Sequence, residues 1–187
     1  MTDLETRLTA LEERLRLLED ERAITRLILS YGPLVDSGCA GDVAALWDED
    51  GVYDVDEILM TGRAEIDAMV RSAGHQGWIG GGCAHFVGPP HVTVSASGDE
   101  AAAVGYTLMI VNRPEEGFTL RRATANHWRL RRTASGWSVT NRTSRVLDGR
   151  EESPDLLASH FPGAVRHRPP TDGRAPERPA RLSDQHG

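Results

Sequence analysis

The sequence predicts an α+β fold in which N-terminal helices pack against a curved antiparallel or mixed sheet. Two observations support this prediction. Between Leu4 and Val70 the apolar residues recur mostly at helical spacing, whereas from His85 onward they recur at every second position. Turn-forming residues then divide the later part into a meander of long strands. Helices that precede a run of antiparallel strands are typical of a sheet covered by helices on one side.

The length and composition fit one domain with an appendage. The chain has 187 residues, of which 39% are hydrophobic, enough for a buried core. We expect the domain to span residues 1–152. Residues 153–187 are expected to form a tail rich in proline and arginine that is partly disordered or draped over the domain.

The charge and cysteine content exclude several classes of protein. A net charge of -7 argues against nucleic-acid binding. No apolar run reaches the ~18 residues of a membrane span, and the N-terminus is charged from Asp3 onward, so we expect a cytoplasmic protein. All 21 basic residues are arginine, which removes lysine chemistry. Cys39 and Cys83 are expected as free thiols, with a single disulfide as the alternative.

A long helix begins the chain. The segment from Thr2 to Glu5 reads as a capping box. A seam of leucines with heptad spacing follows, formed by Leu4, Leu8, Leu11, Leu15 and Leu18. The seam is shorter than the ~3–4 heptads of an independent coiled coil, so we expect it to pack on its own domain or on a neighbouring subunit. Gly32 and Pro33 are expected to kink or break this helix.

The remaining elements follow from periodicity and turn signals. We expect helices at 43–47 and 61–72, and a strand at 52–55 between them. Gly80 to Gly82 are expected to form a flexible flap over a pocket, with Trp78 as a lid or packing residue. The later strands are expected at 92–96, 101–111, 118–132 and 137–147.

Several polar residues fall on faces that should point inward. Strict alternation places Asn141 and Arg145 on the apolar face of the last strand, and Asn126 on the apolar face of its neighbour. Tyr106 shares a face of the strand 101–111 with valine, leucine and isoleucine. A face that mixes apolar, amide and guanidinium groups is better suited to lining a pocket than to filling a solid core.

Three further residues have the chemistry for acid–base catalysis. Tyr31 and Asp36 lie where a helix should fill the core, and an aspartate is seldom buried without a partner. His85, in the segment GGGCAHFVG, is the available partner. A carboxylate that holds a histidine, with a phenol nearby, can both remove and donate protons. The alternative is that Asp36 and His85 only tie the helix to the sheet, that Tyr31 only packs, and that Arg145 forms an ion pair within the chain or with another subunit.

The order of elements and several segments resemble the SnoaL-like branch of the superfamily named after nuclear transport factor 2. The likeness covers residues 4–152 and is carried by LEERLRLLEDERAITRLILSYGPLVDSG, TGRAEID, CAHFVG and NRTSRVLDG. It is nearest to dehydratases of the bile acid 7α-dehydratase and scytalone dehydratase type. The resemblance implies a cone-shaped barrel that encloses a pocket, and a dimer or trimer. It also implies catalytic roles for Tyr31, Asp36 and His85, with Arg145 lining the site.

These observations lead to a hypothesis and two alternatives. The hypothesis is a cofactor-independent lyase of the dehydratase type that acts on a hydrophobic oxygenated molecule, such as a steroid or polyketide. His85 would be the base and Tyr31 the proton donor. The substrate would be bound by Arg145, Asn126, Asn141 and Tyr106. The alternatives are an isomerase or cyclase that uses the same dyad, and a ligand-binding module without catalysis. We expect no metal site, because Gly88, Pro89 and Pro90 disrupt the spacing of His85 and His91.

Overall fold

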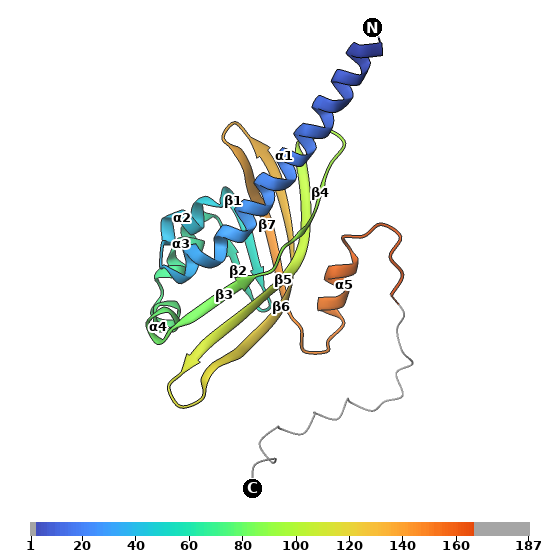
Figure 1. Cartoon of the computed structure of the whole chain (residues 1–187). Coiled ribbons are helices and arrows are strands. Elements are labelled where there is room, and N and C mark those ends of the chain that lie inside the picture. The colour runs from blue at the N-terminus through green and yellow to red at the C-terminus, as the bar shows by residue number, and fades with distance from the viewer. Residues whose placement is uncertain (1–2, 167–187) are drawn as a thin grey trace.

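The computed structural model describes residues 3–166, which form helices packed against one mixed sheet (Figure 1). The helices are α1 (Asp3–Asp36), α2 (Ala40–Ala45), α3 (Arg63–Arg71), α4 (Ala73–Gly81) and α5 (Glu152–Ala158). The strands are β1 (Trp47–Val55), β2 (Ile58–Thr61), β3 (Cys83–Val87), β4 (His91–Val94), β5 (Glu100–Arg113), β6 (Gly117–Thr133) and β7 (Gly136–Val146).

The strands form one open sheet in the order β2-β1-β7-β6-β5-β3, with β4 also paired to β5. All pairs are antiparallel except β1 with β7. Helix α1 crosses the sheet, and α2, α3 and α4 gather around its C-terminal half (Figure 1). The predicted α+β class is therefore confirmed, although the sheet does not close into a barrel.

The core lies between α1 and the concave side of the sheet. Helix α1 contributes Ile24, Ile28 and Val35, which recur at helical spacing and are almost fully buried. They belong to one cluster with Trp47 of β1 and Leu130 of β6. This packing fixes the C-terminal end of α1, and therefore Tyr31 and Asp36, against the sheet.

Helix α1 continues through Gly32 and Pro33 to Asp36, so the predicted break at these residues is wrong. Proline removes one backbone donor, but Tyr31, Gly32 and Val35 are buried on either side of it. Pro33 itself faces solvent. Tertiary packing of the helix outweighs the loss of one hydrogen bond, and Asp36 consequently ends the helix at the sheet.

Gly32 permits the close approach of α1 to β3, and its replacement gives a prediction. A Cβ atom at this position would lie 2.2 Å from the carbonyl oxygen of His85. Gly32→Ala should therefore lower the free energy of unfolding by about 1–3 kcal/mol in urea titrations, although alanine is normally the better helix former. Gly41→Ala in α2 is the control, because no atom lies within 4 Å of its added Cβ. Equal stability of both variants would contradict this account.

Two β-bulges change which residues face the core. In β6, Met109 pairs with Arg122 and Ile110 with Leu120, which leaves Arg121 as an extra residue. Between β6 and β7, Arg129 pairs with Asn141 and Leu130 with Val139, which leaves Thr140 as an extra residue. A single extra residue moves every later side chain to the opposite face. Strict alternation from Asn126 would place Phe118 and Leu120 on the inward face, but both are exposed because the bulge reverses the alternation.

Other segments also differ from the prediction. Strand β2 and helix α5 were not predicted, and Gly80 and Gly81 end α4 instead of forming a flap. Helix α5 packs on β6 and β7. Cys39 and Cys83 are free, as expected. Within residues 3–166, no helix combines the length and apolar character needed to cross a bilayer. The predicted cap at Thr2 and most of the predicted tail, 167–187, lie outside the described residues.

His160, which follows α5, lies in a cluster of histidines with His91 and His127. His160 Nε2 lies 3.1 Å from His91 Nδ1 and 3.2 Å from the Thr93 hydroxyl. Burial, and then the proximity of His91, lowers the pKa of His160. Burial, together with His160 and Arg129, lowers the pKa of His127 beside it.

Because these pKa values are lower in the folded chain, the unfolded chain takes up more protons as the pH falls below its own pKa of about 6.5. The contribution to stability is therefore complete above that pH and is lost below it. We expect the melting temperature to fall between about pH 7.5 and about pH 5.5, and to fall less in His160→Asn, as measured by thermal unfolding. An equal fall in both proteins would contradict this role.

Candidate active site

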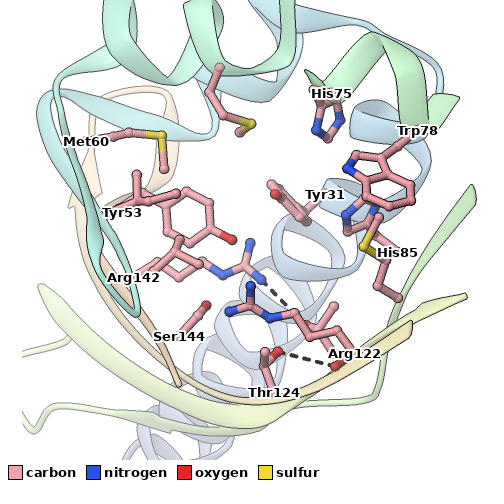
Figure 2. A pocket seen from close by; sticks show the side chains of 15 residues that line it. Tyr31, Tyr53, Met60, His75, Trp78, His85, Arg122, Thr124, Arg142 and Ser144 are labelled. Atoms are coloured by element: carbon pink, nitrogen blue, oxygen red, sulfur yellow. Dashed lines mark hydrogen bonds between the residues drawn. The ribbon is translucent and has the colours of Figure 1, made fainter. Parts of the chain in front are cut away.

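A cavity of about 290 Å³ lies between the concave side of the sheet and the helices. Its volume is near the lower end of the range of about 300–1,000 Å³ for ligand pockets. Figure 2 shows His75, Trp78 and His85 on one side, Tyr53, Arg142 and Ser144 on the other, and Tyr31 between them. The complete lining is Tyr31, Tyr53, Val55, Ile58, Met60, Met69, His75, Trp78, His85, Thr107, Met109, Arg122, Thr124, Arg142 and Ser144.

His85 and Asp36 meet at the wall of this cavity, as the sequence predicts. Asp36 Oδ1 lies 2.6 Å from His85 Nδ1, and Asp36 Oδ2 accepts a hydrogen bond of 2.6 Å from the His85 backbone N–H. The imidazole lines the cavity, whereas Asp36 lies behind it. Since Nδ1 is occupied by the carboxylate, Nε2 is the ring nitrogen left to act on a ligand.

The environment of Asp36 keeps it ionised. Burial favours the neutral acid, but the hydrogen bonds from the His85 ring and backbone outweigh burial, with help from the Cys83 thiol, and lower the pKa of Asp36. An ionised carboxylate holds a proton on Nδ1 and stabilises the imidazolium that forms when Nε2 accepts another. The pair therefore has the arrangement of a general base and its positioning residue.

Tyr31 lies beside His85, with the two ring centroids 6.3 Å apart and nearly perpendicular. It also makes edge contacts with Trp47 and Tyr53. Burial, together with Tyr53, raises the pKa of Tyr31 well above its ordinary value. The phenol is therefore protonated at neutral pH and is available as a donor.

The cavity also contains a buried arginine that the sequence analysis did not select. Arg142 is 2% exposed, and its guanidinium carbon lies 4.2 Å from the ring centroid of Tyr31 and 4.6 Å from that of Tyr53. The ring of Trp128 is also close, at 5.3 Å. Cation–π contacts of this kind stabilise a desolvated cation. Its polar side-chain partners include the uncharged groups of Asn126, Thr107 and Tyr31.

No ion pair of Arg142 with an acidic side chain is found within residues 3–166, although the residue is buried. Its Nε and Nη2 both donate to Asn126 Oδ1, at 3.1 and 2.9 Å, but its Nη1 is buried without a hydrogen-bond partner among the described residues. A buried ionic group without a counter-ion is costly unless something pairs with it. The arrangement suits a ligand that brings negative charge, or develops it, beside Arg142.

Asn126 supports Arg142 instead of lining the cavity. Its side chain is fully buried, and its Nδ2 donates to the Thr107 hydroxyl at 3.1 Å and to the Thr124 hydroxyl at 3.1 Å. Its Oδ1 also accepts a hydrogen bond from Ser144. Asn126 therefore orients the guanidinium, and it is not among the residues that line the cavity.

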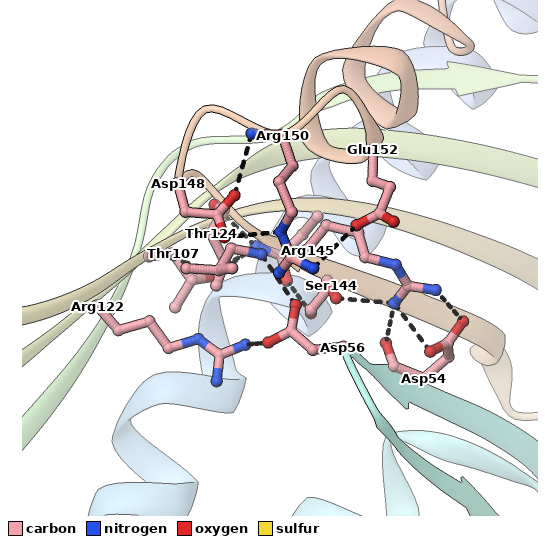
Figure 3. Close-up of polar contacts among 12 residues, drawn as sticks. Asp54, Asp56, Thr107, Arg122, Thr124, Ser144, Arg145, Asp148, Arg150 and Glu152 are labelled. Carbon is pink, nitrogen blue, oxygen red and sulfur yellow. Dashed lines mark hydrogen bonds and ion pairs between the residues drawn. The ribbon is translucent and has the colours of Figure 1, made fainter. Parts of the chain in front are cut away.

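Arg145 does not line the cavity, so its predicted place in the sheet is wrong. The bulge at Thr140 reverses the alternation of β7, which turns Arg142 and Ser144 toward the cavity and Arg145 away from it. Arg145 forms a bidentate ion pair with Asp54, with distances of 2.8 and 2.7 Å (Figure 3). The hydrogen bond from Arg145 to Asp54 raises the pKa of Arg145.

Asn141 and Tyr106 also lie outside the cavity lining, contrary to prediction. Asn141 lies on the same face of β7 as Arg145, and its Oδ1 accepts a hydrogen bond from Thr143. Tyr106 is about half exposed, whereas the next residue, Thr107, lines the cavity. Alternation along β5 therefore turns Tyr106 to the opposite face of the sheet.

Two cavity residues lie on α4, of which His75 was not predicted and Trp78 was expected as a lid or packing residue. The His75 ring stacks on His85 with centroids 5.7 Å apart, and burial lowers the pKa of His75. Trp78 lines the cavity, and Arg121 lies over its ring. The segment AGHQGWIGG gave no periodic signal, because its small residues do not define an apolar face. Alternation along β1 could have predicted Tyr53 as a cavity residue, because it faces inward together with Val55.

Asp36, Cys83 and His85 each have an atom that can bind a metal ion, and these three atoms all lie within 4.8 Å of one another. The Cys83 thiol donates to Asp36 Oδ1 at 3.5 Å, and the other two groups are hydrogen-bonded to each other. Burial and the charge of Asp36 raise the pKa of Cys83 to about 11. The thiol is therefore a donor to the carboxylate, and the group is a hydrogen-bonded cluster centred on Asp36.

Comparison with known proteins agrees with this architecture. A family model described as a SnoaL-like domain matches residues 16–143. The chain is 42% identical to an NTF2-like protein with a cystatin-like fold from Novosphingobium aromaticivorans. That match covers 80% of this chain and 96% of the other, with a TM-score of 0.77. No curated protein matches the chain.

Two more distant structures share the fold. A candidate scytalone dehydratase from the same organism is 21% identical over 70% of this chain and 86% of its own, with a TM-score of 0.58. ActVI-ORFA from Streptomyces coelicolor is 16% identical over 69% of this chain and 96% of its own, with a TM-score of 0.60. At these identities the likeness concerns the fold alone.

Proposed function

Because the chain belongs to the family of SnoaL-like domains, we propose that it is an acid–base enzyme of the dehydratase type. The observation that carries the proposal is the ionised Asp36 behind His85, in a cavity that also holds the buried Arg142. The largely apolar lining suits a small hydrophobic molecule with an oxygen function.

Each cavity residue has a role in this proposal. His85 Nε2 removes a proton from a carbon next to a carbonyl group, and Asp36 stabilises the resulting imidazolium. Arg142 pairs with the negative charge that develops on the carbonyl oxygen. Tyr31, kept protonated by burial, donates a proton to the departing hydroxyl group, which leaves as water. The proton gained by His85 then passes, directly or through solvent, to the Tyr31 phenolate, so atoms and charge balance.

The orphaned Nη1 of Arg142 narrows the substrate class. A neutral hydrocarbon would leave this buried cation without a partner, which is unfavourable. A carbonyl or carboxylate oxygen beside Arg142 would supply the missing acceptor. We therefore assign the substrate to β-hydroxy carbonyl compounds on an apolar skeleton.

An isomerase or cyclase is the second candidate, because His85, Asp36 and Arg142 would also form an enolate without expelling a leaving group. An enolate that is reprotonated before it reacts further exchanges the acidic carbon-bound hydrogen with solvent. Incubation of fused-ring β-hydroxy ketones with the protein in deuterium oxide separates the possibilities. Loss of the mass of water indicates a lyase, and a rearranged product whose mass is unchanged apart from incorporated deuterium indicates an isomerase or cyclase.

The same experiment can reject catalysis. Ketones that bind, as judged by a raised melting temperature, but neither exchange hydrogen nor lose water would indicate a binding module. His85→Gln is the matched control variant, since it retains the cavity and removes the proposed base. Exchange at the same rate in this variant would assign the chemistry to another group.

A further inference from the structure

The N-terminal half of α1 extends away from the rest of the chain (Figure 1). The first buried residue of the helix is Asp20, so the turns before it make no core contact. Residues 3–19 form a projecting helical arm of about 25 Å at 1.5 Å per residue. A helix of this length is only marginally stable in water without packing, so the arm would gain stability from a surface that covers its apolar stripe.

The arm carries the five leucines of the heptad seam on its surface. Leu4, Leu8, Leu11, Leu15 and Leu18 are between 54% and 74% exposed. The prediction that this seam packs on its own domain is therefore wrong. The remaining interpretation is that the seam packs on another subunit. Seams in which leucines alternate at spacings of three and four residues pair with a seam of the same kind.

The charges beside the seam identify both the partner and its direction. With Leu8 and Leu15 at heptad position a, the flanking g positions are Arg7 and Arg14 and the e positions include Glu12 and Glu19. In a parallel, in-register pair, each g residue faces the e residue five positions later on the other helix. Arg7 then faces Glu12, and Arg14 faces Glu19, on both sides of the seam. An antiparallel pair would instead bring like charges together.

We propose that the arm forms a parallel coiled coil with the same segment of a second copy of this chain. Two and a half heptads bind weakly, so the pairing should depend on protein concentration. The parallel direction places both domains at the same end of the coil. This proposal does not depend on the proposed enzymatic function.

Disulfide trapping tests the direction of the pairing. In the full-length chain with Cys39 and Cys83 replaced by alanine, Leu4→Cys should form a linked dimer on mild oxidation, because d positions of a parallel pair face each other. In an antiparallel pair, a positions face d positions, so the Leu4→Cys chain would not link to itself but to a chain that carries Leu15→Cys. That pattern, or the absence of any linked species, would overturn the proposal.

Charge reversal tests the partner. In the Leu4→Cys chain, Arg7→Glu with Arg14→Glu should reduce the disulfide linkage, because it places glutamate opposite glutamate, although acidic residues near a helix N-terminus favour the helix itself. Glu12→Arg with Glu19→Arg should reduce it likewise. A mixture of the two reversed chains should recover the linkage as a mixed dimer. Linkage that is unaffected by reversal, or that does not recover on mixing, would overturn the proposal.

Discussion

Replacement of His85 by glutamine should lower the rate of hydrogen exchange and of dehydration by about 10²–10⁴-fold. Glutamine has a similar reach but no basic nitrogen, so the variant loses the proton acceptor and retains the volume of the side chain. The backbone N–H that donates to Asp36 is also retained. Circular dichroism and thermal unfolding should therefore show a folded domain, and the loss should appear in kcat.

The matched control is His91→Gln. His91 is also on a strand, but it is exposed and lies outside the cavity lining. Its effect on kcat should be less than about twofold, which is within the scatter expected for a residue remote from the reaction. Equal losses in both variants would indicate an indirect effect of removing histidine and would contradict the assignment of His85 as the base.

Asp36→Asn tests the positioning role separately. An amide can donate a proton toward Nδ1, which would place the imidazole proton on Nε2 and block proton abstraction. We expect a fall in kcat comparable with that of His85→Gln, with a smaller change in KM because Asp36 does not line the cavity. The nitrogen chemical shifts of His85 report separately whether the proton has moved to Nε2, and a fall in kcat without that movement would contradict the proposed positioning role.

The encounter of Asp36 with His85 could be predicted because both residues interrupt apolar patterns. A carboxylate on a buried helical face needs a partner, and the histidine in the first strand after the helices was the available candidate. Helical periodicity also located most of α1 and α3, and period-two alternation located β5, β6 and β7. These patterns predict the elements correctly because they repeat over many residues, so that one irregular position does not obscure them.

The sequence could not predict that Arg142, and not Arg145, faces the cavity. The single extra residue Thr140 decides which of the two arginines points inward. The bulge at Thr140 exchanges the two faces of β7, and no local signal in NRTSRV distinguishes a strand with a bulge from one without. The position of a bulge depends on how β6, β7 and β1 fit together, which is a tertiary property. The exposure of the leucine seam could not be predicted either. Helical spacing shows that the leucines form a stripe, but it does not show which surface covers that stripe.

The two arginines of β7 give the second large prediction. Arg142→Met should lower kcat/KM by about 10²–10³-fold, the usual effect of removing a donor that stabilises a developing oxyanion. Methionine fills much of the space between the rings of Tyr31 and Tyr53. It also removes a buried cation whose Nη1 has no partner among residues 3–166, so the desolvation cost of the charge is relieved.

The stability of Arg142→Met should therefore change much less than its activity. Asn126 Oδ1 loses two donors but still accepts from Ser144, which limits the cost to about 1–2 kcal/mol before the relief of desolvation. A melting temperature near that of the parent chain, together with a large loss of kcat/KM, would show that the chain tolerates the buried charge for its chemistry.

Arg145→Met is the control, because it removes the arginine of the same strand that faces away from the cavity. Its ion pair with Asp54 is partly exposed, so its loss should cost about 1 kcal/mol or less of stability and leave kcat/KM within about twofold. Chemical denaturation and the dehydration assay measure both quantities on the same samples. If Arg145→Met were the inactive variant and Arg142→Met the active one, the oxyanion role would belong to the residue that strict alternation places inward, and the bulge would have no functional consequence.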